Sequence, residues 1–150
     1  MGSVSATEQF LKHSPPLKKE IDALRDDMKN LLTKFYKISV PNNVIAIAGT
    51  ATTLSCMNLG LKAFDEQKVE KSTIIISEIN NLINASCTLT SKEILAKYGP
   101  VMNGREDIIF AGIIILSEIM NVLEIPKVIV SSRGIRYGAI VKKLNLNIKS

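Results

Sequence analysis

The segment Val44-Ile45-Ala46-Ile47-Ala48-Gly49-Thr50-Ala51-Thr52-Thr53-Leu54 decides the fold. Its apolar residues 44–48 have the length and composition of a short buried strand. Gly49-Thr50 is expected to turn the chain, and residues 51–61 are expected to form a helix. A strand that leads through a glycine turn into a helix is the basic unit of an α/β layer.

A second strand–turn–helix unit is predicted near the C-terminus. Lys127 to Ser131 reads as a buried strand, Ser132-Arg133-Gly134 as a turn, and Ile135 to Leu144 as a helix. Strands that alternate with helices favour a short, mainly parallel sheet flanked by helices. Because ligands gather beyond the carboxyl ends of such strands, the two turns should open to the same side.

A long amphipathic helix is expected to precede the first strand. Ser14-Pro15-Pro16 is a start signal, with Ser14 as the cap, and Pro41 ends the helix. We expect its apolar stripe to pack on the sheet, although such a stripe also suits a partner helix. The stripe consists of Leu17, Ile21, Leu24, Met28, Leu31, Phe35 and Ile38.

The middle of the chain is less decisive. Residues 69–73 fit a strand or a loop, and residues 74–83 fit a helix, although three successive isoleucines leave a strand open. A short helix over residues 91–96 is capped by its first residue. Asn103-Gly104-Arg105-Glu106 resembles a capping box. The helix expected over residues 106–123 is apolar on nearly every side and should therefore be central.

Composition fits one folded domain in a reducing compartment. The chain has 150 residues, of which 46% are hydrophobic and 22% charged, so disorder is excluded. Cys56 and Cys87 lie in unrelated contexts and are expected to be reduced, which favours the cytoplasm. The most apolar run, 108–116, is far shorter than the roughly 20 residues of a spanning helix. No membrane partner is expected.

The net charge of +5 suits a polyanionic ligand, or equally a solvated basic surface. The chain has no Trp, three Tyr and four Phe, which is a poor platform for stacking single-stranded nucleic acid, so no nucleic-acid partner is expected. His13 is expected in a solvated loop. Because no Cys/His cluster and no nucleophile motif is present, we assign no catalytic and no metal-ligating residue.

Three segments carry donors that suit an anion. Gly49 and Thr50 stand at a helix start, where backbone N–H groups and the helix dipole favour negative charge, although a tight turn with a threonine cap explains them equally. Arg105 either grips an anion or pairs with a neighbouring carboxylate. Arg133 and Arg136 follow the second strand. The two strand-end turns are therefore candidates for a shared phosphate cleft.

Taken in order, these segments resemble the exopolyphosphatase / guanosine pentaphosphate phosphohydrolase family. The resemblance implies the second, C-terminal lobe of an actin-like ATPase or ribonuclease H-like fold, with residues 1–150 as a single partial lobe. The motifs that carry it are Gly2-Ser3-Val4, Thr7-Glu8-Gln9-Phe10, Ala48-Gly49-Thr50-Ala51-Thr52-Thr53-Leu54, Leu59-Gly60-Leu61, Gly104-Arg105-Glu106-Asp107, Ala111-Gly112 and Ser132-Arg133-Gly134-Ile135-Arg136-Tyr137-Gly138.

The resemblance implies hydrolysis of phosphoanhydrides, with release of the terminal phosphate of inorganic polyphosphate or the 5′ phosphate of guanosine pentaphosphate. By resemblance, Gly49 and Thr50 line the cleft, Arg105 and Arg136 reach the polyanion, and Arg133 is a weaker candidate. Such enzymes use Mg²⁺. The metal, the water-activating Glu and the loops Asp-x-Gly-Ser-Asn and Asp-x-Gly-Gly-Gly-Ser would belong to an upstream lobe. No such loop occurs in this sequence, so we expect this chain alone to lack phosphatase activity.

Two other hypotheses stay open. One is a non-catalytic module from a truncated gene that binds polyphosphate, a nucleotide or a partner lobe. The other is a lobe of a kinase or chaperone relative with the same fold. A lobe that begins partway through its sheet should expose a strand edge and apolar surface. We therefore expect a homodimer, aggregation, or pairing with the upstream lobe.

Overall fold

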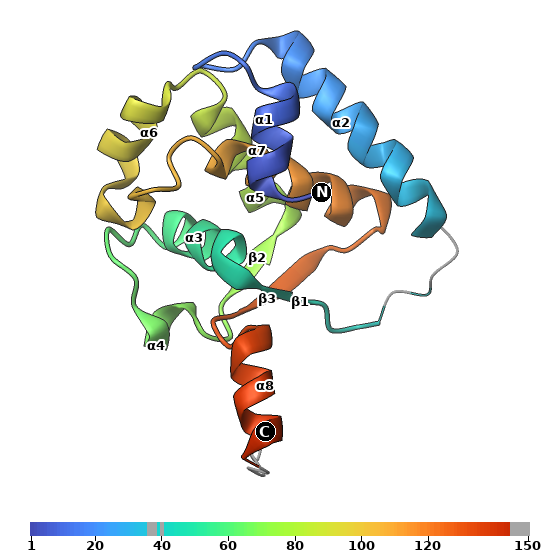
Figure 1. Cartoon of the computed structure of the whole chain (residues 1–150), viewed down its shortest axis with the longest axis vertical. Coiled ribbons are helices and arrows are strands. Elements are labelled where there is room, and N and C mark those ends of the chain that lie inside the picture. The colour runs from blue at the N-terminus through green and yellow to red at the C-terminus, as the bar shows by residue number, and fades with distance from the viewer. Residues whose placement is uncertain (36–38, 40, 145–150) are drawn as a thin grey trace.

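A small three-stranded sheet organises the fold (Figure 1). The computed structural model describes residues 1–35, 39 and 41–144. The strands β1 (Ile45–Ile47), β2 (Thr73–Ile75) and β3 (Lys127–Ser131) lie in the order β1-β3-β2. β3 pairs in parallel with β1 and antiparallel with β2. The predicted α/β class is confirmed. The sheet is mixed because β2, the segment that the sequence left open, is an antiparallel edge strand.

The core lies against one face of this sheet. Val128 and Val130 of β3 and Ile74 of β2 are buried on that face, whereas their neighbours along the strands are less buried. In β1, Ile45 is 61% exposed and Ile47 is 40% exposed. The prediction of a buried first strand is therefore wrong, because β1 lies at an edge and only one face of the sheet is covered.

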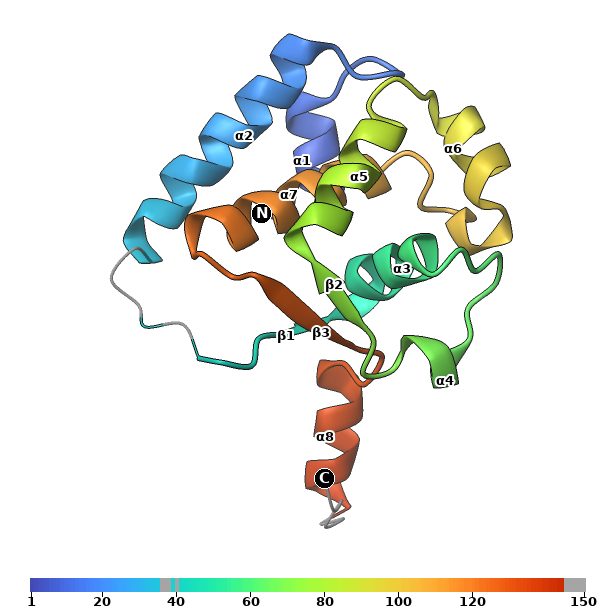
Figure 2. The same cartoon turned by 180° about the vertical axis from the view of Figure 1, so that it is seen from behind.

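Helices make up most of the described chain. They are α1 (Ser3–Phe10), α2 (Lys18–Leu32), α3 (Ala48–Asn58), α4 (Glu66–Val69), α5 (Ile76–Ser86), α6 (Ser91–Tyr98), α7 (Ile109–Val122) and α8 (Ile135–Lys143), with 3-10 turns η1 (Thr33–Phe35) and η2 (Pro100–Met102). Figures 1 and 2 show α8 leaving the C-terminal end of β3 and pointing away from the other helices. None of the described helices is long and apolar enough to cross a membrane.

α7 is the central helix, as its sequence predicts. It contacts α1, α2, α3 and α5, and Ile113 and Ile114 are fully buried. Burying an isoleucine completely contributes about 1.5–3 kcal/mol. The helix begins at Ile109 rather than at residue 106, because the chain is still in turn conformation over residues 103–108.

α2 is amphipathic, but its buried stripe packs on α7 and α1 instead of on the sheet. Leu24 and Met28 are buried as predicted, whereas Leu31 is 40% exposed and the adjacent Leu32 is buried in its place. The predicted packing on the sheet is wrong because α7 supplies the apolar surface that the stripe covers. Ile38, the last residue of the predicted stripe, lies outside the described residues.

α2 does not begin at Ser14. The helix start is organised by Glu20, whose carboxylate lies 2.7 Å from His13 Nδ1, and the His13 side chain remains 58% exposed. The Ser14 hydroxyl instead accepts a hydrogen bond from the Ser91 backbone N–H at 3.0 Å. Ser14 therefore binds the first residue of α6, whose own cap is Thr90 rather than the predicted Ser91.

Candidate functional site

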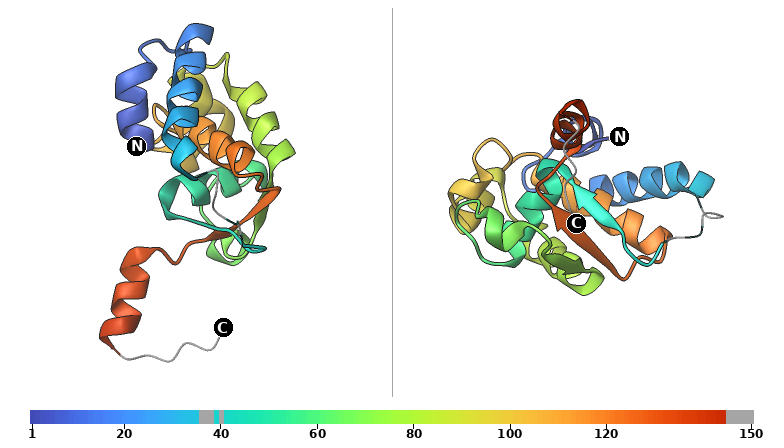
Figure 3. Two further views of the ribbon diagram at one scale, coloured as in Figure 1. Left: turned by 90° about the vertical axis from the view of Figure 1, so that its right-hand side faces the viewer. Right: turned by 90° about the horizontal axis from the view of Figure 1, so that it is seen from below.

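The turns that follow β1 and β3 open into one cavity of about 610 Å³. Gly49 reaches it from the first turn of α3, Arg105 from the turn before α7, and Arg136 from the first turn of α8. Figure 3 shows the departure of α8 from the end of β3. Both strand-end turns thus open to the same side, as the strand directions predict, and two of the three candidate arginines line the space.

Gly49 is placed directly beneath the Arg105 guanidinium. A Cβ atom built at residue 49 would lie 2.7 Å from Arg105 Cζ, which is closer than real Cβ contacts allow. Because Gly49 has no side chain, there is room for the guanidinium at the N-terminus of α3. Arg105 also lines an adjoining cavity of about 460 Å³ together with Phe64 and Thr52, so this one side chain stands between two cavities.

Two helix N-termini contribute to the larger cavity. α3 begins at Ala48, whose φ of +76° turns the chain sharply out of β1, earlier than the predicted start at residue 51. α8 begins after Gly134. Neither helix start has a side-chain cap among the described residues. Their first-turn N–H groups and the positive ends of their dipoles therefore favour an anion in the cavity.

The structure does not bring Thr50 to the cavity. Its methyl group packs against Gly112 of α7, and the residue lines a separate, mainly apolar groove of about 360 Å³. Thr52 lines the cavity in its place. Residues three apart share a helix face, so the helical period counted from Gly49 would have selected Thr52 instead of Thr50.

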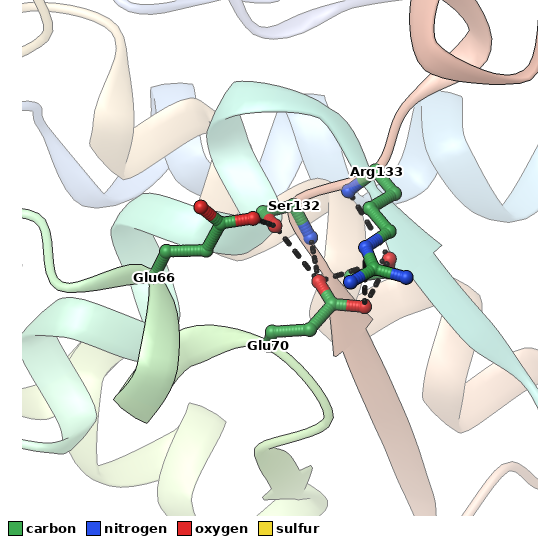
Figure 4. Close-up of polar contacts among 5 residues, drawn as sticks. Glu66, Glu70, Ser132 and Arg133 are labelled. Atoms are coloured by element: carbon green, nitrogen blue, oxygen red, sulfur yellow. Dashed lines mark hydrogen bonds and ion pairs between the residues drawn. The ribbon is translucent and has the colours of Figure 1, made fainter.

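Arg133 does not line the cavity either, and it faces Glu70 instead (Figure 4). Its Nε lies 3.9 Å from a Glu70 carboxylate oxygen, and its guanidinium lies 5.4 Å from the centre of the Tyr137 ring. Glu70 also accepts hydrogen bonds from Ser131 and Ser132. Sequence reasoning missed Glu70, because an isolated glutamate after a short helix carries no motif.

The cavity carries positive charge without a matching carboxylate. In the part of the chain that the structure describes, Arg105 and Arg136 form no ion pair, and no Asp or Glu lines the cavity. The described residues also contain no group of three side chains suited to holding a metal ion. Because Mg²⁺ is held by oxygen ligands, carboxylates above all, these walls fit an anion and do not fit the metal itself.

Fold and site together define an α/β protein in which two arginines and two helix N-termini line one cavity, a combination that suits an anion. The model of the Ppx/GppA phosphatase family matches residues 1–147. The chain belongs to this family, and the family predicted from the sequence motifs is confirmed.

Curated relatives are much longer than this chain. It is 28% identical over 149 residues to the bifunctional 3-dehydroquinate synthase/phosphatase of Fusobacterium nucleatum. The matched region covers 95% of this chain and 22% of that protein. It is 26% identical over 122 residues to exopolyphosphatase 2 of Mycobacterium tuberculosis, which covers 79% of the chain and 38% of that protein.

Solved structures agree with the fold. The Ppx/GppA family member of Aquifex aeolicus superposes with a TM-score of 0.87 at 27% identity, over 99% of this chain and 48% of that one. An exopolyphosphatase from Cytophaga hutchinsonii, at 19% identity and a TM-score of 0.81, shows the fold alone. The actin-like ATPase fold is thus confirmed. The chain spans less than half the length of these relatives.

Proposed function

We propose that this chain binds the phosphate groups of a phosphoanhydride and contributes to their hydrolysis. The substrate is inorganic polyphosphate, which loses its terminal phosphate, or guanosine pentaphosphate, which loses its 5′ phosphate. The observation that carries the proposal is the pair Arg105 and Arg136 in one cavity without a carboxylate partner among the described residues. Guanidinium groups bind phosphate oxygens through charge-assisted hydrogen bonds.

The two arginines have distinct parts in the proposal. The Arg105 guanidinium lies against Gly49 at the start of α3, in the space that the missing side chain leaves open. Arg136 approaches from α8. Phosphoryl transfer depends on positioning and on neutralising the charge around the transferred group. Arg105 and Arg136 supply both for the phosphate chain.

The remaining machinery is proposed to come from another lobe. The cavity walls described here hold no carboxylate that would activate water or bind Mg²⁺, so a second lobe would supply the Glu and the metal ligands. The proposal treats residues 1–150 as the C-terminal lobe of that pair. Cys56 and Cys87 are free thiols, which supports the proposal that the protein works in the cytoplasm.

Titration with inorganic tripolyphosphate tests the binding part. We expect the chain to bind it and Arg105→Ala or Arg136→Ala to weaken binding about tenfold each, the effect of losing one charge-assisted contact. Lys34→Ala, a distant exposed cation on η1, is the matched control and should bind as the unchanged chain does. Absence of binding by the unchanged chain, or an equal loss in the control, would contradict the proposal.

A non-catalytic binding module is the second candidate, favoured by the lack of a carboxylate on the described cavity walls. Phosphate release from polyphosphate in the presence of Mg²⁺ separates the two functions. We expect no release by this chain alone and release once a lobe with the missing loops is added. Release by the chain alone that disappears in Arg136→Ala would show that it holds a complete site. No release with any added lobe would favour the binding module.

A further inference from the structure

Glu70, just after α4, is bound by three successive residues, the last residue of β3 and the first two of the turn that leads to α8 (Figure 4). Its carboxylate accepts hydrogen bonds from the Ser132 backbone N–H at 2.7 Å, the Ser132 hydroxyl at 2.8 Å and the Ser131 hydroxyl at 3.0 Å. Arg133 Nε lies 3.9 Å away. A backbone donor, two hydroxyls and a guanidinium form a set of contacts that would otherwise suit an external anion.

Low exposure and a negative charge keep the Glu70 carboxylate bound to these groups. Its side chain is 16% exposed. Burial raises the pKa of Glu70, but the hydrogen bonds from Ser132 and Ser131 and the charge of Arg133 outweigh this and hold it below its ordinary value. Glu70 is therefore ionised at neutral pH. Two adjacent backbone hydrogen bonds tie the same loop to β3: the Lys71 N–H donates to the Val130 carbonyl at 2.9 Å, and the Val130 N–H donates to the Ser72 carbonyl at 2.8 Å.

The bound turn leads directly into the cavity. Arg136 lies three residues after Arg133, in the first turn of α8. None of the described residues of α8 is buried, so packing along the helix contributes little to its direction. The contacts at its N-terminal end therefore have a large share in deciding where Arg136 points.

We propose that Glu70 is a positioning residue for the polyanion site. By holding the turn at residues 131–133, it fixes the first turn of α8 and with it Arg136, and it engages Arg133 so that this arginine does not bind the ligand. The inference rests on the proposed function, since it assigns Arg136 to the phosphate chain. Glu70 itself touches no ligand.

Calorimetric titration with inorganic tripolyphosphate tests the inference on the full chain. Removing a hydrogen-bonded charge frees the turn, so we expect Glu70→Ala to weaken binding about tenfold. Glu66→Gln is the matched control, because Glu66 contacts the same turn only through the Ser132 hydroxyl at 3.4 Å. Arg133→Ala should bind within about twofold of the unchanged chain, an energy difference below the size of one hydrogen bond.

A double-mutant cycle separates positioning from general destabilisation. If Glu70 acts through Arg136, Glu70→Ala should add no further loss in an Arg136→Ala background. An equal loss in both backgrounds would overturn the inference, because the effect would then not pass through Arg136. Tighter binding in Glu70→Ala would also overturn it, since the carboxylate would then merely repel the anion.

Amide hydrogen exchange keeps this inference distinct from the proposed function. The Ser132 amide should exchange about tenfold faster in Glu70→Ala than in the unchanged chain, because it loses its acceptor. An unchanged exchange rate of the Ser132 amide would show that Glu70 does not hold the turn at residues 131–133, whether or not a ligand binds. If the unchanged chain does not bind tripolyphosphate, both the proposed function and the positioning role are refuted. If it binds normally and Glu70→Ala has no effect on binding, only the positioning role is refuted.

Discussion

The space above Gly49 is filled by the guanidinium of Arg105. Glycine is needed at this position because it has no Cβ atom, and the guanidinium occupies the space that a Cβ would take. In other respects alanine would be preferred in a helix. The neighbouring atoms belong to the far end of a flexible side chain, so a methyl group there would displace the guanidinium and leave the backbone in place.

Gly49→Ala should separate stability from binding. We expect the free energy of unfolding to stay the same or rise by up to about 1 kcal/mol, from the higher helix propensity of alanine. Tripolyphosphate binding should weaken as much as in Arg105→Ala. Thermal unfolding and calorimetry measure the two effects. Gly138→Ala on α8, where a Cβ would meet no atom within 4 Å, is the control, and normal binding by Gly49→Ala would refute the assignment.

The Glu20 carboxyl makes the stability of the fold depend on pH in the acidic range. Burial raises the pKa of this carboxyl, but hydrogen bonds with His13 and with the backbone N–H groups of Leu17 and Lys12 lower it from 4.5 to about 2. The folded state thus binds this proton more weakly than the unfolded chain. Its stabilising contribution is complete above pH 4.5 and is lost as the pH falls towards 2.

Chemical denaturation at pH 7 and pH 3 checks this prediction. Glu20→Gln should lose less stability between the two pH values than the unchanged chain, because the titrating carboxyl is gone. Asp22→Asn, an exposed position on the same helix, should keep the full loss. Identical pH dependence in the unchanged chain and in Glu20→Gln would show that the carboxyl does not carry it.

At the site, the sequence predicts the positions that motifs mark and misses those set by packing. Gly49, Arg105 and Arg136 follow from a strand-end glycine and from basic turns, and they meet in the cavity. Thr50 lies one residue from Gly49 but on a different helix face. Arg133 faces Glu70, 63 residues away in sequence, a partner that no local pattern reveals.

Close packing of α3 against α7 depends on Gly112. A Cβ at this buried position would lie 2.5 Å from the Thr50 methyl carbon. We expect Gly112→Ala to lower the free energy of unfolding by about 1–3 kcal/mol, the usual cost of overpacking. Thr50→Ser removes the methyl group, so the double variant should recover most of the loss. Urea unfolding measures both, and a double variant as unstable as Gly112→Ala would contradict this contact.

Helices and strands were predicted best where the sequence pattern fits only one type of secondary structure. The apolar α7 and the strand β3 appear at the expected places, because length and pattern agree. β2 and α5 divide a run of three isoleucines at Ile75 and Ile76, a boundary that periodicity does not mark. α2 has the predicted amphipathic character, but its neighbour is α7 instead of the sheet, because a stripe does not specify its partner.

The uncovered face of the sheet concerns the whole molecule. Ile45 of β1 and Ile75 of β2 are 61% and 43% exposed there, and β1 has no strand on its outer side among the described residues. Open edges and apolar surface promote association. We therefore expect the chain to associate as its concentration rises, unless another lobe covers this face.

Sedimentation velocity over a concentration series tests this expectation. Ile45→Thr combined with Ile75→Thr keeps β-branched side chains in both strands and should shift the chain towards the monomer. Ile135→Thr on α8, which is 82% exposed, should leave association unchanged. Loss of association in Ile135→Thr alone would place the contact on α8 instead of on the sheet.

α8 brings Arg136 to the cavity although none of its described residues is buried. A helix that is fastened only through its first turn keeps some freedom to tilt, and this remaining freedom is reduced when its arginine binds a ligand. The entropy lost at that step lowers the affinity that the chain shows by itself. A second tether for α8, such as a cross-link to the body of the protein in this pose, should therefore tighten phosphate binding without adding any contact to the phosphate.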